Sequence, residues 1–279
     1  MWFLGAMLTT VCFGINNSIF KWSTGKGYSK VNLQLLFYAS ALILTFAYGM
    51  ATKALHFNVM AILLGILIGV LNANGNIQMS KAFEKGPASL TAPIISANTV
   101  FPVLSAGLIF HEKISISQWL GILLILASVV VIQYTPKRPS GKTNYLPWIG
   151  RISLAVLSFG ILGVLMKLAA NLHISSIDIL VSMYGGGSIY LLLLNASAKE
   201  KMSKAEVKLG ALVGAISVAG YGSYFFALQT GIASIVYPLV SLNCLMVVLA
   251  GCILFKEKMR SYQIVGVLSA LLGVVLTKI

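Results

Sequence analysis

Long apolar stretches alternate with short polar joints along the whole chain. Ten of these stretches approach the roughly 20 residues that a helix needs to span a bilayer. We therefore expect an all-α polytopic membrane protein with ten transmembrane helices. The expected spans are residues 2–20, 32–51, 59–78, 87–109, 116–134, 147–167, 176–194, 208–228, 232–254 and 261–278.

The composition agrees with this pattern and excludes an ordinary soluble domain. Hydrophobic residues make up 58% of the chain, charged residues make up 9%, and the mean hydropathy is +0.92. Soluble domains carry about 25% charged residues, so this chain has too little polar surface to cover a soluble globule. The first stretch has no basic region before it and no small-residue cleavage site after it. We interpret it as the first membrane helix and not as a signal peptide.

The chain repeats itself at a shift of 145 residues. The sequence GPASLTAPIISAN, which begins at Gly86, returns as GIASIVYPLVSLN with its proline, second serine and asparagine in place. At this shift, or at 146 for the lysines, the aligned pairs include Gly65/Gly210, Gly69/Gly214, Pro93/Pro238, Ser96/Ser241, Asn98/Asn243, Glu112/Glu257 and Lys21/Lys167. We expect two five-helix repeats, residues 1–135 and 147–279, joined by a polar linker at residues 136–146.

Each repeat holds an odd number of spans, so consecutive copies must lie in opposite orientations in the membrane. Inverted repeats are a common architecture of secondary transporters, whose substrate site lies near the bilayer midplane at the interface of the repeats. One half then moves against the other, and access to the site alternates. The repeat therefore predicts transport by alternating access.

Each half also ends in the same signature, F-x-E-K-x-x-x-x-Q-x-x-G. It reads FHEKISISQWLG from Phe110 and FKEKMRSYQIVG from Phe255. With five spans in each half, the chain resembles the EamA-type members of the drug/metabolite transporter superfamily over essentially its whole length. The resemblance implies two inverted five-helix repeats and a transport function. It leaves the substrate open, because the family carries amino acids, nucleotide and sugar derivatives, and drugs.

The third span carries four side-chain amides within the sequence LNANGNIQ. A side-chain amide in a membrane helix needs a partner or water, and Asn72 and Asn76 lie one helical turn apart. Because four amides exceed the need of one packing contact, we expect a water-filled central cavity, with hydrogen bonds between helices as the alternative. The residues expected to bind substrate in this cavity are Asn16, Asn72, Asn76, Asn98, Tyr221, Tyr224 and Asn243.

Residues kept in both copies lie on opposite membrane faces after inversion, so we expect them to serve structure or gating. Pro93 and Pro238 are expected to loosen or kink the fourth and ninth spans. Glu112 and Glu257 are expected to cap neighbouring helices, with a gating role as the alternative. Close helix packing is expected at two Gly-x-x-x-Gly pairs, which are Gly65 with Gly69 and Gly210 with Gly214.

Placing an ionisable side chain within a membrane span costs free energy, so such a residue is a candidate for a functional role. Lys21 and Lys167 close equivalent spans, and we interpret them as lysines that extend to the headgroups, with ligand binding as the alternative. No span has a central acid, whereas small multidrug transporters of the superfamily use a membrane-embedded glutamate in their first helix. This difference disfavours proton-coupled export of lipophilic cations and favours a neutral, zwitterionic or anionic substrate.

No motif supports an enzyme, a metal site or a nucleic-acid interface. His56, His111 and His173 lie in joints far apart in the sequence, and the three cysteines show no metal-ligand or disulfide pattern. The net charge of +14 would suggest nucleic acid in a soluble chain, but here the basic residues lie between spans. We expect no catalytic residue, cofactor or metal. The expected partners are a small-molecule substrate and the lipid bilayer, and the protein is expected to be a monomer, with a homodimer as the alternative.

Basic residues are distributed unequally over the two membrane sides. If the joints alternate sides, sixteen Lys and Arg residues fall on one side and four on the other. Basic loops are retained in the cytoplasm, which places both termini outside, whereas ten-segment relatives usually have both termini in the cytoplasm. We expect an exporter of a small polar, amino-acid-like metabolite in the plasma (inner) membrane. The alternatives are an uptake porter for a sugar-like solute and a non-transporting scaffold or sensor with a degenerate transporter fold.

Overall fold

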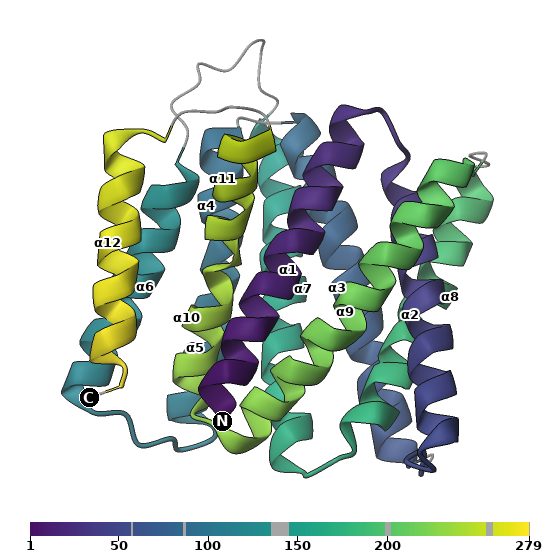
Figure 1. The fold of residues 1–279 in the computed structure, drawn as a ribbon, viewed down its shortest axis with the longest axis horizontal. Helices are drawn as coiled ribbons and strands as arrows, with labels where there is room; N and C mark the ends of the chain where they lie inside the picture. The colour runs from purple at the N-terminus through teal and green to yellow at the C-terminus, as the bar shows by residue number, and fades with distance from the viewer. Residues whose placement is uncertain (57, 86–87, 135–144, 199–201, 255–258, 279) are drawn as a thin grey trace.

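The computed structural model describes residues 1–279 apart from residues 57, 86–87, 135–144, 199–201, 255–258 and 279. In this described part every regular element is a helix (Figure 1). The helices are α1 (Trp2–Gly25), α2 (Lys30–Ala51), α3 (Val59–Lys85), α4 (Ala88–Ser96), η1 (Ala97–Thr99), α5 (Val100–Leu108), α6 (Ile116–Gln133), α7 (Tyr145–Asn171), α8 (Ser176–Ala198), α9 (Lys204–Thr230), α10 (Ala233–Ser241), α11 (Asn243–Leu254) and α12 (Ser261–Leu276). Most of the expected linker at 136–146 lies outside the described residues, as do Gly86, Phe255, Glu257 and Lys258.

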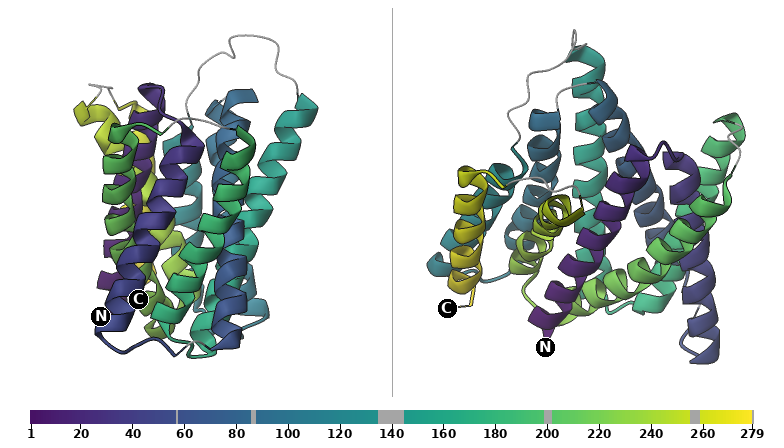
Figure 2. Two further views of the ribbon diagram at one scale, coloured as in Figure 1. Left: turned by 90° about the vertical axis from the view of Figure 1, so that its right-hand side faces the viewer. Right: turned by 45° about the horizontal axis from the view of Figure 1, so that its top comes forward.

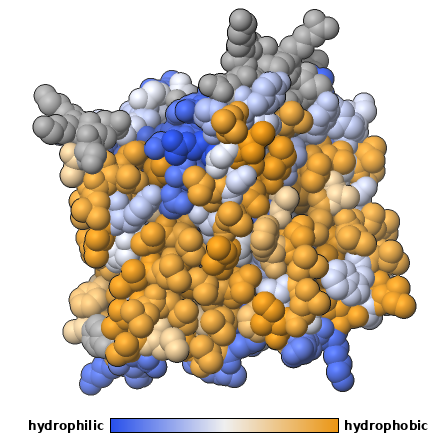
Figure 3. Space-filling view, turned by 180° about the vertical axis from the view of Figure 1, so that it is seen from behind, coloured by the Kyte–Doolittle hydropathy of each residue, from blue (hydrophilic) through white to orange (hydrophobic). Residues whose placement is uncertain are grey.

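The helices form a multi-pass membrane protein. Nine segments of the described chain are long and apolar enough to span a membrane, and Ser261–Leu276 is a shorter apolar helix. Together they account for the ten expected spans, of which the fourth and ninth are each divided. Figure 3 shows the matching surface, a broad hydrophobic band bordered by hydrophilic residues. The prediction of an all-α polytopic fold is confirmed.

The interruptions of the fourth and ninth spans follow the prolines and do not coincide with them. α4 continues past Pro93 and is followed by the 3₁₀ turn η1, and α10 continues past Pro238 until α11 begins. At each interruption an asparagine, Asn98 or Asn243, donates to the carbonyl three residues earlier, at 2.6 and 2.9 Å. Such side-chain bonds compete with the helical hydrogen bonds. The regular helix is therefore interrupted at the asparagines, after the prolines.

The two halves of the molecule interleave. α3 packs along α7 and α8 of the second half, and in the same way α9 packs along α1 and α2 of the first half. α2 also contacts α8, and α6 lies beside α12, as Figures 1 and 2 show. Exchanging the halves maps these extensive contacts onto themselves. The centre of the molecule is therefore an interface between the two repeats.

Glycines permit the closest of these contacts. Gly65 and Gly69 of α3 lie against α8, and a Cβ added at either position would crowd main-chain atoms of that helix. Gly210 and Gly214 of α9 lie in the same way against α2. Small residues let membrane helices approach closely, so these four positions bring α3 and α9 against the opposite half.

Candidate functional site

A central cavity of about 730 Å³ lies between the halves. Residues from both repeats line it, and they combine aromatic and aliphatic side chains with amides and hydroxyls. Phe13, Phe20, Phe83 and Phe159 contribute apolar surface from three different helices. An apolar wall with a few convergent polar groups is typical of small-molecule sites.

The structure brings six of the seven residues expected to bind substrate to the wall of this cavity. They are Asn72, Asn76, Asn98, Tyr221, Tyr224 and Asn243. The seventh, Asn16, is buried in the helix interface and is not part of the wall, whereas the next residue, Asn17, is. Successive residues of an α-helix point about 100° apart. The expectation for Asn16 was therefore wrong by one position.

The wall also holds polar side chains that were not predicted to bind substrate, among them Asn17, Gln34, Gln133 and Tyr237. Asn17 donates to the side-chain oxygen of Asn243 at 3.1 Å, which links the two repeats at the cavity wall. The sequence does hold a signal for two of them, because Gln34 is an amide near the start of an apolar span and Asn17 adjoins another asparagine. Gln133 was hidden because it lies at the end of its span.

The four amides of α3 divide between two faces of that helix. Asn72 donates to the Tyr221 hydroxyl at 2.7 Å, and Asn76 donates to the main-chain and side-chain oxygens of Asn72 at 2.9 and 3.2 Å. Asn74 and Gln78 are not part of the cavity wall, and they bond to side chains of α7 and α8. The amide side chains of α3 therefore belong to two separate sites, one on each face of the helix.

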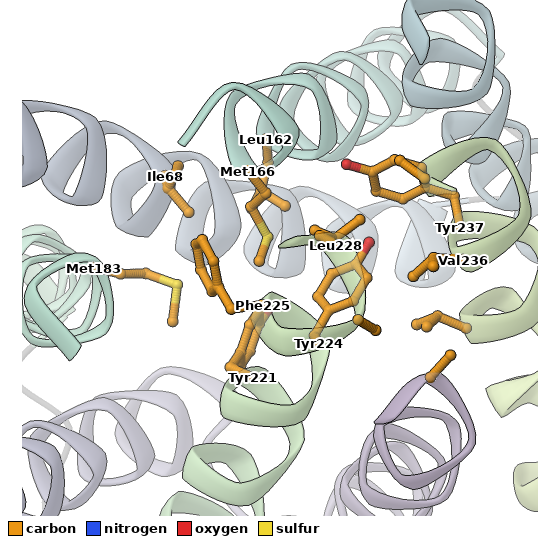
Figure 4. Close-up of a cluster of buried hydrophobic side chains, with 14 of the residues drawn as sticks. Ile68, Leu162, Met166, Met183, Tyr221, Tyr224, Phe225, Leu228, Val236 and Tyr237 are labelled. Atoms are coloured by element: carbon orange, nitrogen blue, oxygen red, sulfur yellow. The ribbon is translucent and has the colours of Figure 1, made fainter. Parts of the chain in front are cut away.

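Aromatic rings form one wall of the cavity. The ring of Phe13 lies 4.7 Å from that of Tyr221 and 5.9 Å from that of Tyr224, and the Tyr224 ring lies 6.0 Å from that of Tyr237. The Tyr237 hydroxyl donates to the Gly163 carbonyl at 2.7 Å. Figure 4 shows the three tyrosines within one cluster of buried side chains. Ring packing of this kind fixes the positions of the hydroxyl groups that face the cavity.

Glu112 closes one side of the interface between the halves. It follows α5 and accepts hydrogen bonds from the N–H groups of Ala233 and Ser234, each at 2.9 Å, and from the Ser234 hydroxyl. These N–H groups begin α10, where the helix dipole favours a carboxylate. The Lys167 ammonium lies 3.0 Å from the Glu112 carboxylate. We call Glu112, Lys167, Ala233 and Ser234 the Glu112 seal.

The Glu112 seal holds two charged groups out of water. The side chains of Lys167 and Glu112 are 8% and 13% exposed. We expected Lys167 to extend to the headgroups, but it pairs with Glu112 inside the protein. Burial acts to raise the pKa of the Glu112 carboxyl, but hydrogen bonds from Ser234 and Ala233 and from the Lys167 ammonium outweigh it and lower that pKa below its ordinary value. The carboxylate is therefore the stable form in the seal.

The cavity extends toward the opposite face of the molecule, which we call the basic face (upper in Figure 1). Its wall includes Lys21 near the end of α1, Lys30 at the start of α2 and Gln263 near the start of α12. No lining residue belongs to the helix ends beside the Glu112 seal. Within the described chain the wall contains no acid, and no group of His, Cys, Asp and Glu is placed to hold a metal ion.

The model of the EamA-like transporter family matches the chain twice, over residues 1–134 and 146–279. The chain belongs to the EamA-like transporter family. It is also similar to the "Probable 4-amino-4-deoxy-L-arabinose-phosphoundecaprenol flippase subunit ArnE" of Proteus mirabilis (strain HI4320), with 37% identity over 76 residues, which are 26% of this chain and 67% of that relative. A solved chain described as "Crystal structure of protein" shares the fold, with a TM-score of 0.82 over 98% of both chains at 12% identity. This EamA-like protein is a membrane transporter, and the resemblance to the drug/metabolite transporter superfamily is confirmed.

Proposed function

We propose that this EamA-like transporter moves a small polar metabolite across the membrane by alternating access, with the central cavity as its substrate site. The observation that carries the proposal is a polar cavity built by both halves, which extends toward one face and is closed at the other by the Glu112 seal. A scaffold or sensor with a degenerate transporter fold would fill this volume with side chains. The cavity of about 730 Å³ therefore supports transport over that alternative.

The chemistry of the wall favours a substrate without net positive charge. Five asparagines offer both donors and acceptors, which suit hydroxyl, carboxylate and ammonium groups alike. Lys21 and Lys30 place positive charge on the wall near the basic face, and no acid in the described wall is available to neutralise a lipophilic cation. We therefore infer a neutral, zwitterionic or anionic metabolite, with Asn72, Asn76 and Tyr221 among its hydrogen-bonding partners.

In alternating access, equivalent residues of the two repeats would close opposite ends of the cavity in turn. The counterparts of Lys167 and Glu112 in the other half are Lys21 and Glu257, of which Glu257 lies outside the described residues. We infer that an equivalent seal forms at the basic face when the Glu112 seal opens. Discrete exchange between two packed arrangements is the usual way in which such interfaces move, and it exposes the site to one side at a time.

The distribution of charge supports loading from the cytoplasm and therefore export. The cavity extends toward the basic face, and basic loops are retained in the cytoplasm. This orientation leaves both termini outside the plasma (inner) membrane. A reporter fused to the C-terminus that fluoresces only in the cytoplasm is expected to stay dark, and a bright fusion would reverse the orientation and the direction of transport.

A second candidate substrate is an amphipathic molecule with a sugar-bearing head. The relative from Proteus mirabilis is described as a flippase subunit for a sugar-linked phosphoundecaprenol. The cavity of the present chain also combines phenylalanine rings with amides, which suits a molecule that is part apolar. Uptake of a sugar-like solute remains the alternative in the opposite direction.

Reconstitution into liposomes tests these candidates side by side. Labelled amino acids, organic anions, sugars, a lipophilic cation and a sugar-bearing lipid are supplied separately, with protein-free vesicles and Asn72→Leu protein as controls. We expect a zwitterionic or anionic metabolite to move with the unmodified protein, to move more slowly with Asn72→Leu at low substrate concentration, and not to enter protein-free vesicles. Movement of the lipophilic cation alone would contradict the proposal, and transfer of the lipid between leaflets without any soluble substrate would establish the second candidate.

A further inference from the structure

A second polar site lies outside the cavity, on the side of α3 that faces α7 and α8. Asn74 accepts hydrogen bonds from Gln78 and from the Tyr190 hydroxyl, each at 3.0 Å, and donates to the Ser158 hydroxyl at 2.9 Å. Gln78 in turn accepts a hydrogen bond from Nη1 of Arg151 at 2.7 Å. The network thus joins three helices and ends in a guanidinium group.

The charge of Arg151 is not neutralised by any acid of the described chain. Arg151 lies in the second turn of α7 and is half-buried. A charged side chain within a membrane helix is costly unless it finds a partner, and Gln78 is neutral. The four carboxylates in the described residues all bind other groups; they are Glu84, Glu112, Asp178 and Glu206.

The surroundings of Arg151 are those of the boundary between lipid headgroups and acyl chains. On α7, Leu146 and Ile149 are 82% and 51% exposed and present apolar surface to the membrane. On α3, Lys81 is exposed and lies one turn beyond Gln78 on the same side of the helix. Figure 3, seen from the side on which α3 and α7 lie, shows hydrophilic side chains that reach from the basic face into the hydrophobic band.

We propose that Arg151 and Lys81 bind the phosphate of an anionic phospholipid at the surface where α3 and α7 pack together. A guanidinium forms paired hydrogen bonds with phosphate oxygens, and basic pockets between membrane helices bind anionic headgroups. Gln78, held by Asn74, positions the guanidinium. None of these residues is part of the cavity wall, so the site does not depend on which substrate the transporter carries.

Native mass spectrometry of the delipidated, detergent-purified protein tests this site. The protein is titrated with phosphatidylglycerol, with phosphatidylcholine and with soluble glycerol phosphate. We expect one phosphatidylglycerol to be retained in preference to phosphatidylcholine and not to be displaced by glycerol phosphate. Arg151→Gln is expected to weaken retention about fivefold or more, whereas Lys208→Gln, an exposed lysine of the same face on α9, leaves it unchanged.

Equal retention of the two lipids, or equal retention by Arg151→Gln and the unmodified protein, would overturn the proposal. Displacement by glycerol phosphate would also overturn it, because the site would then recognise a soluble phosphate. If Arg151→Gln does not fold, the unmodified protein still provides a test through a phosphatidylglycerol that carries a photoreactive group near its head. Adducts within residues 74–85 or 145–160 support the site, and adducts confined to other helices refute it.

Discussion

α4 and α10 are copies of one sequence unit, yet they occupy different environments. Residues 233–240 of α10 are all buried, whereas Leu90 and Ile94 of α4 are 45% and 41% exposed. Their counterparts in the repeat, Ile235 and Leu239, are 1% and 0% exposed. Since the two units are related in sequence, the difference reflects the conformation in which each is held.

The contacts of the two units explain the difference. α10 packs against α5, and the Glu112 seal holds its first N–H groups. The equivalent pair, α4 and α11, makes no extensive contact within the described chain, and the cavity lies between their side chains. The interface between the halves is thus closed where α5 meets α10 and open where α4 faces α11 across the cavity, which is the asymmetry that the proposed alternation needs.

Cysteine labelling at one pair of equivalent positions is expected to give the largest contrast. Val103 in α5 is 2% exposed, and its counterpart Val248 in α11 lines the cavity. In a background whose native cysteines are replaced by alanine, we expect Val248→Cys to react with a membrane-impermeant thiol reagent and Val103→Cys to stay protected. Adding Glu112→Gln should expose Val103→Cys, and equal reactivity of the two positions before that change would contradict the comparison.

Breaking the Glu112 seal should have the next largest effect. Glu112→Ala leaves the Lys167 ammonium buried without a counter-charge in the described chain and with only the Leu228 carbonyl at 3.4 Å. Removing one member of a buried pair lowers the free energy of unfolding by about 3–5 kcal/mol. Glu84→Ala is the matched control, because Glu84 is 58% exposed in its pair with Lys30 and exposed pairs contribute about 0–1 kcal/mol. Denaturation in detergent measures both variants, and similar losses in the two would refute the structural role of the seal.

A smaller effect is expected from a comparison of the two faces of α3. Asn72→Leu removes the hydrogen bond that Asn72 donates to the buried Tyr221 hydroxyl on the cavity wall. Leaving a buried polar group without its partner costs about 1–3 kcal/mol of free energy. We expect roughly a tenfold or greater rise in the KM for transport. Asn74→Leu, two residues along the same helix, should lower thermal stability and leave KM unchanged. If both variants changed KM equally, the assignment of the two faces would fail.

The smallest effect concerns pH. The pKa of Glu112 is lowered in the folded protein, so its carboxylate contributes stability that is present above the unfolded pKa and is lost as the pH falls through the lowered folded pKa. The stability difference between the unmodified protein and Glu112→Gln should therefore be constant near neutral pH. It should shrink only below the ordinary glutamate pKa of about 4.3. Thermal unfolding over a pH series measures it, and a change near pH 7 would point to another group.

The fold is largely predictable from this sequence because its two main signals need no knowledge of the partner helices. Each apolar stretch corresponds to helix, and the repeat at 145 residues relates the two sets of contacts. Helix ends are less predictable, since α1 continues to Gly25 and α3 to Lys85, well beyond the apolar stretches. The polar residues at these helix ends continue the helix but carry no hydropathy signal.

The candidate site is predictable to a helix but not to each residue. The sequence LNANGNIQ does not reveal which amides face the cavity, because that depends on where α7, α8 and α9 pack. The same limit moved the wall residue of α1 from Asn16 to Asn17. The pairing of Glu112 with Lys167 joins residues of different halves, and no local pattern encodes it.

The interleaved packing of the halves has a consequence during synthesis. α3 enters the membrane before α7 and α8 are made, so the face that carries Gly65 and Gly69 has no partner helix yet. α1 and α2 likewise enter the membrane before their partner α9 is made. The nascent first half therefore holds polar side chains in a solvent that cannot satisfy them. The insertion machinery must shelter these helices until the second half arrives, and the halves made as separate chains should accumulate only when both are expressed together.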